Sequence, residues 1–200
     1  MNIGIDVDGV LVDMEGYQLN HGTEYFSKVL GKEVVNPKAY DIEQIFSCTH
    51  AEREKFWRKY IWGYCLTEPP IKEAPQTISK LHNDGHKIFL ITGRAHTTEN
   101  GITGKLFRWM LKYWLKKNHI FYNDIIFCSE KDSSTNKLDI CIKNKIDVMI
   151  DDKPENLYTL IEKFKVICYP AIWNEDIVDD SFIRVSDWNQ IYDCISKIKE

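Results

Sequence analysis

The chain opens on a short apolar run that ends in two carboxylates. Residues 3–11 read Ile-Gly-Ile-Asp-Val-Asp-Gly-Val-Leu, and an apolar run of this kind predicts a buried strand. Asp6 and Asp8 are spaced by two, so both side chains are expected on one side of the strand, and Gly9 lets the backbone turn sharply. Two converging carboxylates are costly unless a cation or a substrate shares their charge. Asp and Gly are also ordinary turn residues, so the rest of the chain decides between a turn and a functional site.

Four further apolar runs follow, separated by segments with helical periodicity. We expect strands at residues 87–92, 124–128, 147–152 and 166–168, and helices at 15–30, 51–63, 71–84, 104–118, 137–144, 154–164 and 188–198. Strands that alternate with helices predict a parallel sheet with helices on both faces. The expected fold class is therefore α/β, a doubly wound parallel sheet. Ligands bind such sheets beyond the carboxyl ends of the strands.

The segment between the first two strands is longer than a simple crossover. A crossover connection needs about a dozen residues, whereas residues 13–75 separate these two strands. The segment has helical stretches of its own and follows the two aspartates directly. We therefore predict that residues 13–75 form a small helical cap over the carboxyl edge of the sheet, and that residues 1–12 and 76–200 form the catalytic α/β core.

Composition narrows the class of function. A net charge of −4 over 200 residues argues against a protein that binds nucleic-acid polymers, because affinity for a phosphate backbone needs a basic surface. The six cysteines form no C-x-x-C pair and several lie in apolar runs, which indicates buried thiols rather than a disulfide framework or a zinc site. No apolar run approaches the ~18 residues that span a bilayer, and the N-terminus does not resemble a signal peptide. We expect a cytoplasmic protein without a membrane partner, and nothing in the sequence indicates an oligomeric state.

Polar groups follow three other predicted strands. They are Thr92-Gly93-Arg94 after the second strand, Lys131 and Lys137 after the third, and Asp151-Asp152 at the end of the fourth. Parallel strands bring their carboxyl ends to one edge of the sheet, so we expect these groups near the two N-terminal aspartates.

The four groups, in this order, resemble the motifs of the haloacid dehalogenase superfamily of phosphohydrolases, over nearly the whole chain. The resemblance implies the Rossmann-like fold of that superfamily, with a small helical cap inserted after the first strand. It implies that Asp6 is the nucleophile that becomes an aspartyl-phosphate, and that Asp8 is first the general acid and then the base. Thr92 and the amide of Gly93 would bind phosphoryl oxygens. A dehalogenase is disfavoured, because a second aspartate and a metal site fit phosphate chemistry.

The same resemblance implies a Mg²⁺ cofactor. Its ligands would be Asp6, the backbone carbonyl of Asp8 and Asp152, with Asp151 as a partner behind them. Mg²⁺ prefers oxygen ligands and keeps several waters. Cations also offset the repulsion between an attacking carboxylate and a phosphate dianion.

A lysine is expected beside the nucleophile, and three lysines are candidates. Lys137 opens the helix after the third strand, Lys131 follows that strand directly, and Lys105 lies on the helix after Thr92. We favour Lys137 over Lys131. For the others, a solvated surface charge is the ordinary interpretation.

Within the superfamily, the chain resembles the 5′(3′)-deoxyribonucleotidase branch, including its bacterial members, at residues 5–10, 92–94 and 147–152. A nucleobase could stack on one or two cap aromatics, at roughly 1–3 kcal/mol per base. Phe56, Tyr60 and Tyr64 recur at helical spacing and are instead expected in the core of the cap. The cap aromatics are Tyr17, Tyr25, Phe26, Tyr40, Phe46, Phe56, Trp57, Tyr60, Trp62 and Tyr64.

The expected function is a Mg²⁺-dependent phosphatase acting on a small phosphomonoester, with a nucleoside monophosphate as the first candidate. One alternative is a phosphatase for a sugar phosphate or a surface-polymer precursor, whose pocket should be polar rather than aromatic. An alternative of another class is a non-catalytic phosphate-binding protein on the same fold. Such a protein has no need of a paired nucleophile and acid.

One helix permits a second interpretation. Residues 105–117 are basic and amphipathic, which is also typical of helices that bind membranes or nucleic acid. We expect instead that one apolar stripe covers the sheet while the lysines are solvated. That stripe is Leu106, Trp109, Met110, Tyr113 and Trp114.

Overall fold

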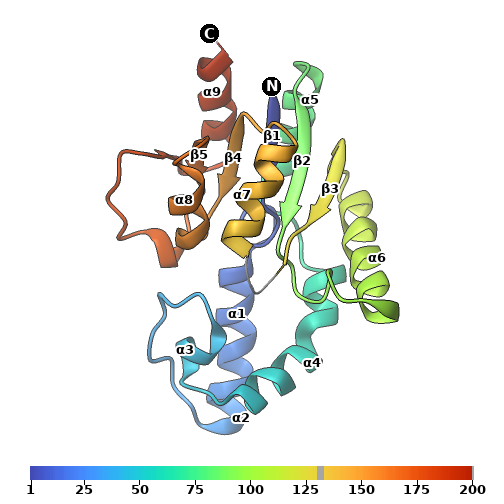
Figure 1. Cartoon of the computed structure of the whole chain (residues 1–200). Coiled ribbons are helices and arrows are strands. Elements are labelled where there is room, and N and C mark those ends of the chain that lie inside the picture. Colours follow the sequence, from blue (N-terminus) through green and yellow to red (C-terminus); the bar gives the residue numbers. More distant parts are fainter. Residues whose placement is uncertain (130–132, 200) are drawn as a thin grey trace.

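The computed structural model describes residues 1–129 and 133–199. Its strands form a fully parallel sheet in the order β3-β2-β1-β4-β5-β6 (Figure 1). The strand order reverses at β1, which lies between β2 and β4, so the doubly wound α/β class is confirmed. The strands are β1 (Asn2–Ile5), β2 (Lys87–Thr92), β3 (Asp124–Phe127), β4 (Val148–Asp151), β5 (Lys165–Cys168) and β6 (Ile183–Arg184).

Helices lie on both faces of this sheet and beyond its carboxyl edge. In Figure 1 the strands point toward α1, α3 and α4, while both chain termini lie at the opposite end. The helices are α1 (Met14–Gly22), α2 (Lys28–Leu30), α3 (Ile42–Phe46), α4 (His50–Leu66), α5 (Ala74–Asn83), α6 (Gly101–Lys117), α7 (Ser133–Lys143), α8 (Pro154–Leu160) and α9 (Trp188–Lys199), with a π-helix η1 (Thr23–Ser27) and a 3₁₀ turn η2 (Ile172–Asn174).

The alternation of side chains along each strand divides the core into two layers. Ile3 and Ile5 of β1 pack with Leu90 of β2 under α5, α6 and α9. Ile91 of β2 and Met149 of β4 point to the other face, where α7 and α8 cover them. The central strands β1, β2, β4 and β5 are therefore buried on both faces, as their continuous apolar sequences predict, whereas β3 and β6 at the edges are partly exposed.

The first strand is shorter than expected. It ends at Ile5, although the amide of Asp6 still donates to the carbonyl of Ile150 at 3.0 Å. Gly9 then adopts a φ of +83°, a left-handed conformation that glycine takes without strain. Asp8 is thus held by a loop rather than by the pleat of a strand.

The helix over residues 101–117 buries a different stripe from the one we expected. Met110 and Trp114 are buried as predicted, but Trp109 is 56% exposed and Tyr113 is 46% exposed, so the prediction for these two was wrong. Phe107, Leu111 and Leu115 take their place against the sheet. Both stripes are apolar along α6, so the sequence alone did not fix the rotation of this helix.

The helices between β1 and β2 have a small core of their own. Phe26, Phe46 and Phe56 pack against one another, with ring centroids of Phe26 at 4.9 Å from Phe46 and 5.4 Å from Phe56. The start of α4 is well capped, since Thr49 forms a capping box with Glu52. This independent cluster lets residues from α1 and α4 approach the sheet edge as one unit.

The cysteines agree with the prediction of buried thiols. All six cysteines are free thiols, and five of them are buried. Within the described residues, no helix is both long and apolar enough to cross a lipid bilayer.

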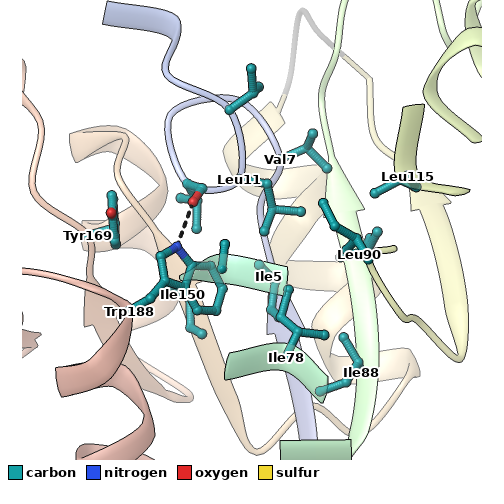
Figure 2. Packing of buried hydrophobic residues seen from close by; sticks show 14 of the residues in the cluster. Ile5, Val7, Leu11, Ile78, Ile88, Leu90, Leu115, Ile150, Tyr169 and Trp188 are labelled. Atoms are coloured by element: carbon teal, nitrogen blue, oxygen red, sulfur yellow. Dashed lines mark hydrogen bonds between the residues drawn. The ribbon is translucent and has the colours of Figure 1, made fainter. Parts of the chain in front are cut away.

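Trp188 supports the loop that follows β1. Its indole is fully buried under the sheet, and its Nε1–H donates to the carbonyl of Val10 at 3.1 Å (Figure 2). Val10 lies two residues after Asp8, so α9 helps to fix the loop that carries both N-terminal aspartates.

We predict that Trp188→Phe lowers the free energy of unfolding by about 1–3 kcal/mol, because the buried carbonyl of Val10 loses its donor. Urea denaturation of the purified variant measures this. Trp109→Phe is the matched control, since Trp109 is largely exposed and surface changes are usually within about 0.5 kcal/mol. Equal stability of the two variants would contradict the role of this hydrogen bond.

Candidate active site

The end of β1 places Asp6 beside a buried lysine. Lys137 lies in the second turn of α7, is almost completely buried, and brings its Nζ to 3.2 Å from Asp6 Oδ1 and 2.6 Å from Asp151 Oδ2. Burial disfavours the charge on Lys137, but the Asp151 and Asp6 carboxylates outweigh this effect and raise its pKa above the usual range. The ammonium is therefore a fixed positive charge between two acidic strand ends.

The Asp6 carboxyl group lies in an environment that resists its ionisation. The pKa of Asp6 is raised to about 7, because the effect of burial and of the nearby Asp151 and Asp8 carboxylates outweighs the lowering effect of Lys137. Asp6 Oδ1 accepts no directed hydrogen bond from the described residues, although the Lys137 ammonium is close. A carboxylate in this position needs further positive charge to stay ionised.

Asp151 and Asp152 leave β4 in different environments. Asp151 is completely buried, and its two oxygens accept from Lys137 Nζ, the Lys153 amide at 3.0 Å and Asn156 Nδ2 at 3.0 and 3.1 Å. Its hydrogen-bonding capacity is thus largely used by the protein itself. Asp151 acts as the counter-charge and anchor of Lys137.

Asp152 has an unused oxygen. Its Oδ2 accepts from Trp173 Nε1 at 3.1 Å, whereas its buried Oδ1 has no hydrogen-bond partner in the described part of the chain. Burial and the neighbouring Asp151 and Asp6 raise the pKa of Asp152 well above the usual value. A Cβ at Gly9 would lie 2.1 Å from Asp152 Oδ2, so this approach requires glycine.

These features fit a divalent cation. One carboxylate oxygen from each of Asp6, Asp151 and Asp152 lies within 4.8 Å of the others. The backbone carbonyl of Asp8 accepts no hydrogen bond from the described residues and is adjacent in sequence to Gly9. Two buried carboxylate oxygens without a hydrogen-bond partner among the described residues, Asp6 Oδ1 and Asp152 Oδ1, in a cluster of hard oxygen donors match the ligand preference of Mg²⁺.

Asp8 is held by Arg94, for which the sequence analysis gave no partner, and by Tyr64, which it placed in the core of the cap. Arg94 donates from Nε and Nη2 to Asp8 Oδ1, with the Nε–Oδ1 distance at 2.9 Å. The Tyr64 hydroxyl donates to the same oxygen at 2.6 Å, and the Arg94 guanidinium lies 5.0 Å from the centroid of the Tyr64 ring. Burial raises the pKa of Tyr64 well above its usual value, with the Asp8 carboxylate as the next cause. The hydroxyl is therefore a donor at neutral pH.

The sequence placed Arg94 near the site, because it follows Thr92-Gly93, but it did not indicate that Arg94 pairs with Asp8. Tyr64 was expected in the cap core with Phe56, and it is indeed buried. Its hydroxyl nevertheless extends from α4 to Asp8. An acidic residue in a loop and a tyrosine 56 positions later give no periodic signal that would pair them.

Thr92 and Gly93 lie at the end of β2, next to β1 in the sheet. Thr92 is completely buried, and its Oγ1 accepts from the Arg94 amide at 3.2 Å. The hydroxyl proton is then available for another acceptor. Gly93 lines the same cavity as Asp6 and Asp8.

The remaining lysine candidates lie elsewhere. Lys105 is exposed on α6 and does not line the cavity around Asp6. Lys131 lies outside the described residues. Among the lysines of the described part of the chain, Lys137 and Lys153 line this cavity.

A cavity of about 640 Å³ connects this cluster to the helices between β1 and β2. Asp6, Asp8, Arg94 and Lys137 form one end of its lining. Further lining residues come from the predicted cap and are of two kinds. The aromatic, apolar and amide side chains are Met14, Gln18, Tyr40, Ile42, Trp57, Ile61 and Tyr64, and the charged or histidine side chains are Asp41, His50, Arg53, Glu54 and Arg58.

Comparison with known proteins places these features in a family. The family model for 5′ nucleotidase, deoxy (pyrimidine), cytosolic type C protein matches residues 1–200. The chain is 26% identical to a Bacillus cereus protein named "Putative nucleotidase", over 98% of this chain and 99% of the relative. It is also 26% identical to the "Putative 5′(3′)-deoxyribonucleotidase" of Chlorobaculum tepidum, over 96% of this chain and 89% of the relative.

The fold has a solved counterpart. A haloacid dehalogenase-superfamily hydrolase of subfamily IA from Geobacter sulfurreducens superposes with a TM-score of 0.60 at 11% identity, covering 97% of this chain and 95% of that chain. The parallel sheet with its reversal at β1 is thus the Rossmann-like haloacid dehalogenase fold. The chain belongs to the family of 5′ nucleotidases, deoxy (pyrimidine), cytosolic type C, and is a phosphatase of the haloacid dehalogenase superfamily.

Proposed function

We propose that this protein is a Mg²⁺-dependent phosphomonoester hydrolase that works through an aspartyl-phosphate on Asp6 and acts on nucleoside monophosphates. One observation carries the proposal. Asp6 and its buried lysine share a cavity with Tyr40, Trp57 and Tyr64. A phosphoryl group and an aromatic base can therefore be held in one continuous site.

In the first step the carboxylate of Asp6 attacks phosphorus, and the ester oxygen of the substrate leaves. Two easier displacements then replace one difficult one. The Lys137 Nζ, which lies 3.2 Å from Asp6 Oδ1, would offset the repulsion between the attacking carboxylate and the phosphoryl oxygens. The Thr92 hydroxyl and the Gly93 amide would donate to the phosphoryl oxygens.

Asp8 would move the proton. Its Oδ1 is occupied by Tyr64 and Arg94, while Oδ2 accepts only a longer contact from Arg94 Nε at 3.2 Å. Oδ2 is therefore the oxygen that would protonate the leaving group. In the second step the same oxygen would take a proton from the water that attacks the aspartyl-phosphate.

Mg²⁺ would be held by Asp6, the carbonyl of Asp8 and Asp152, and when bound it supplies positive charge to the phosphoryl oxygens. Asp151 would stay with Lys137, since its oxygens already have protein donors. The unpartnered Asp152 Oδ1 supports this division of roles.

The aromatic side chains in the lining, Tyr40, Trp57 and Tyr64, support a nucleotide as the substrate. Stacking of a base on an aromatic side chain contributes about 1–3 kcal/mol. Names of relatives such as "Putative 5′(3′)-deoxyribonucleotidase" point to the same substrate class. The cytoplasmic location that we expect from the sequence would give such an enzyme access to the nucleotide pool.

We predict that, in the presence of Mg²⁺, one or more deoxynucleoside 5′-monophosphates are hydrolysed with a kcat/KM at least about tenfold above that of deoxyribose 5-phosphate, the ratio that ~1.4 kcal/mol of base binding provides. A panel of phosphomonoesters with released phosphate as readout measures this. EDTA and Asp6→Asn should each abolish turnover. Near-wild-type turnover by Asp6→Asn would exclude Asp6 as the nucleophile, and equal rates on both substrates would exclude the nucleotide.

Substitutions of Asp151, at the end of β4, and of Asp152, which follows it, should have different effects on Mg²⁺ affinity and on thermal stability. We predict that Asp152→Asn weakens the apparent affinity for Mg²⁺ more than Asp151→Asn does. Asp151→Asn should instead lower the melting temperature more, because it removes a partner of the buried Lys137 charge, a loss of about 3–5 kcal/mol. Titration of activity with Mg²⁺ and thermal unfolding of both variants measure the two effects.

The reverse order of Mg²⁺ affinities would assign the metal ligand to Asp151. A further check comes from pH. Because burial raises the pKa of Asp6 to about 7, protons compete with the cation below that pH. The apparent affinity for Mg²⁺ should therefore rise as the pH increases through about 7.

We predict that Asp8→Asn reduces hydrolysis of a nucleoside monophosphate by about 10²–10⁴-fold, the usual contribution of a general acid. Hydrolysis of p-nitrophenyl phosphate should fall much less in the first step, because its leaving group needs no proton. Burst-phase kinetics with both substrates separate the first step from the second. Equal losses of the first-step rate on both substrates would argue against Asp8 as the acid.

A further inference from the structure

Gln18 carries a buried polar atom that the protein does not satisfy. The side chain lies in the second turn of α1 and is only 1% exposed, yet its Oε1 accepts no hydrogen bond from any described residue. Leaving a buried acceptor unpaired costs about 1–3 kcal/mol. Its neighbour Tyr17 shows the usual behaviour, since the buried Tyr17 hydroxyl donates to the carbonyl of Tyr60 at 2.7 Å. The Gln18 carboxamide therefore requires a separate explanation.

The position of Gln18 supplies one. The residue lines the same cavity as Asp6 and Asp8. It lies one helical turn beyond Met14, which also lines that cavity and stands at the start of α1, directly after the loop that carries the aspartates. One turn of helix spans about 5.4 Å. The carboxamide is thus set back from the phosphoryl end, toward the part of the cavity that the cap encloses.

Part of the cavity that Gln18 lines has apolar walls. Trp57 and Ile61, one turn apart on α4, and Met14 on α1 contribute apolar surface to the cavity. Ligand sites typically combine such walls with a few polar groups that fix the orientation of the ligand. A flat heterocycle matches this arrangement, because its faces are apolar and its edge carries hydrogen-bond donors and acceptors.

We propose that Gln18 determines specificity by hydrogen-bonding the edge of the nucleobase. Its Oε1 would accept from an N–H of the base, and its Nε2 would donate to the adjacent carbonyl or ring nitrogen. Glutamine recognises base edges in this two-bond manner in other settings. The inference rests on the proposed function, because it requires a nucleotide as substrate. Gln18 does not contact the reacting phosphoryl group in this arrangement.

The test uses Gln18→Met, which keeps the size of the side chain and removes its amide. We expect kcat/KM for the best deoxynucleoside 5′-monophosphate to fall about tenfold or more, mainly through KM. Hydrolysis of deoxyribose 5-phosphate, which has no base, should stay unchanged. The melting temperature should stay the same or rise, because an unsatisfied buried acceptor is removed.

A modified substrate gives a second readout. The best nucleotide is compared with its analogue in which the edge N–H is methylated. Wild-type enzyme should discriminate between the two by about tenfold or more, whereas Gln18→Met should treat them alike. Gln44→Met is the matched control, because Gln44 is exposed on α3 and does not line the cavity, and it should behave as wild type.

Three results would overturn the inference. Undiminished discrimination against the methylated base in Gln18→Met would do so while the proposed function stands. A melting temperature several degrees lower, with equal losses on the nucleotide and on deoxyribose 5-phosphate, would indicate a purely structural role. If wild-type enzyme prefers no nucleotide to deoxyribose 5-phosphate, the proposed function fails, and the role of Gln18 in reading a base fails with it.

Discussion

The structure depends on one buried ammonium group held between acidic strand ends. Lys137 brings its charge to Asp151 on β4 and to Asp6 at the end of β1, and all three groups are buried. The parallel pairing of β1 with β4 puts the two carboxylates side by side, and α7 supplies the lysine. Removing one partner of a buried ion pair leaves an uncompensated charge and costs about 3–5 kcal/mol. The contacts of Lys137 with Asp6 and Asp151 therefore stabilise the fold and also form part of the candidate active site.

The parts of the chain divide the tasks that a phosphatase must perform. The sheet edge supplies charge, because carboxylates and cations arrive there from several strands and one helix. The helices between β1 and β2 have a separate core around Phe26 and contribute Trp57 and Ile61 to the cavity, where the proposed recognition of the base would take place. Tyr64 and Arg94 connect the two parts by donating to the same oxygen of Asp8. The two parts thus hold Asp8, the residue proposed to move the proton, between them.

Sequence reasoning predicted the elements whose signal is local. Continuous apolar runs gave the five longest strands, and the order of the polar groups after them gave the superfamily. The residues it could not pair are those joined only by tertiary structure, such as Arg94 with Asp8. The prediction of which side of α6 is buried was wrong for a related reason. Two apolar stripes overlap at Met110 and Trp114, and packing on the sheet buries the stripe with Leu111 rather than the one with Trp109. The strand of Ile183–Arg184 is too short to carry any period.

Unsatisfied polar atoms gather at the cavity, and this links stability to binding. Asp6 Oδ1, Gln18 Oε1, Arg94 Nη1 and Asn156 Oδ1 are buried atoms without a hydrogen-bond partner in the described residues, and all four side chains line the same cavity. Each such atom weakens the ligand-free fold, so the protein holds its donors and acceptors ready at a cost in stability. A ligand that pairs them binds the folded state alone and raises the free energy of unfolding by mass action. The same atoms would make the site selective, because a ligand that leaves any of them unpaired does not recover that part of the free energy.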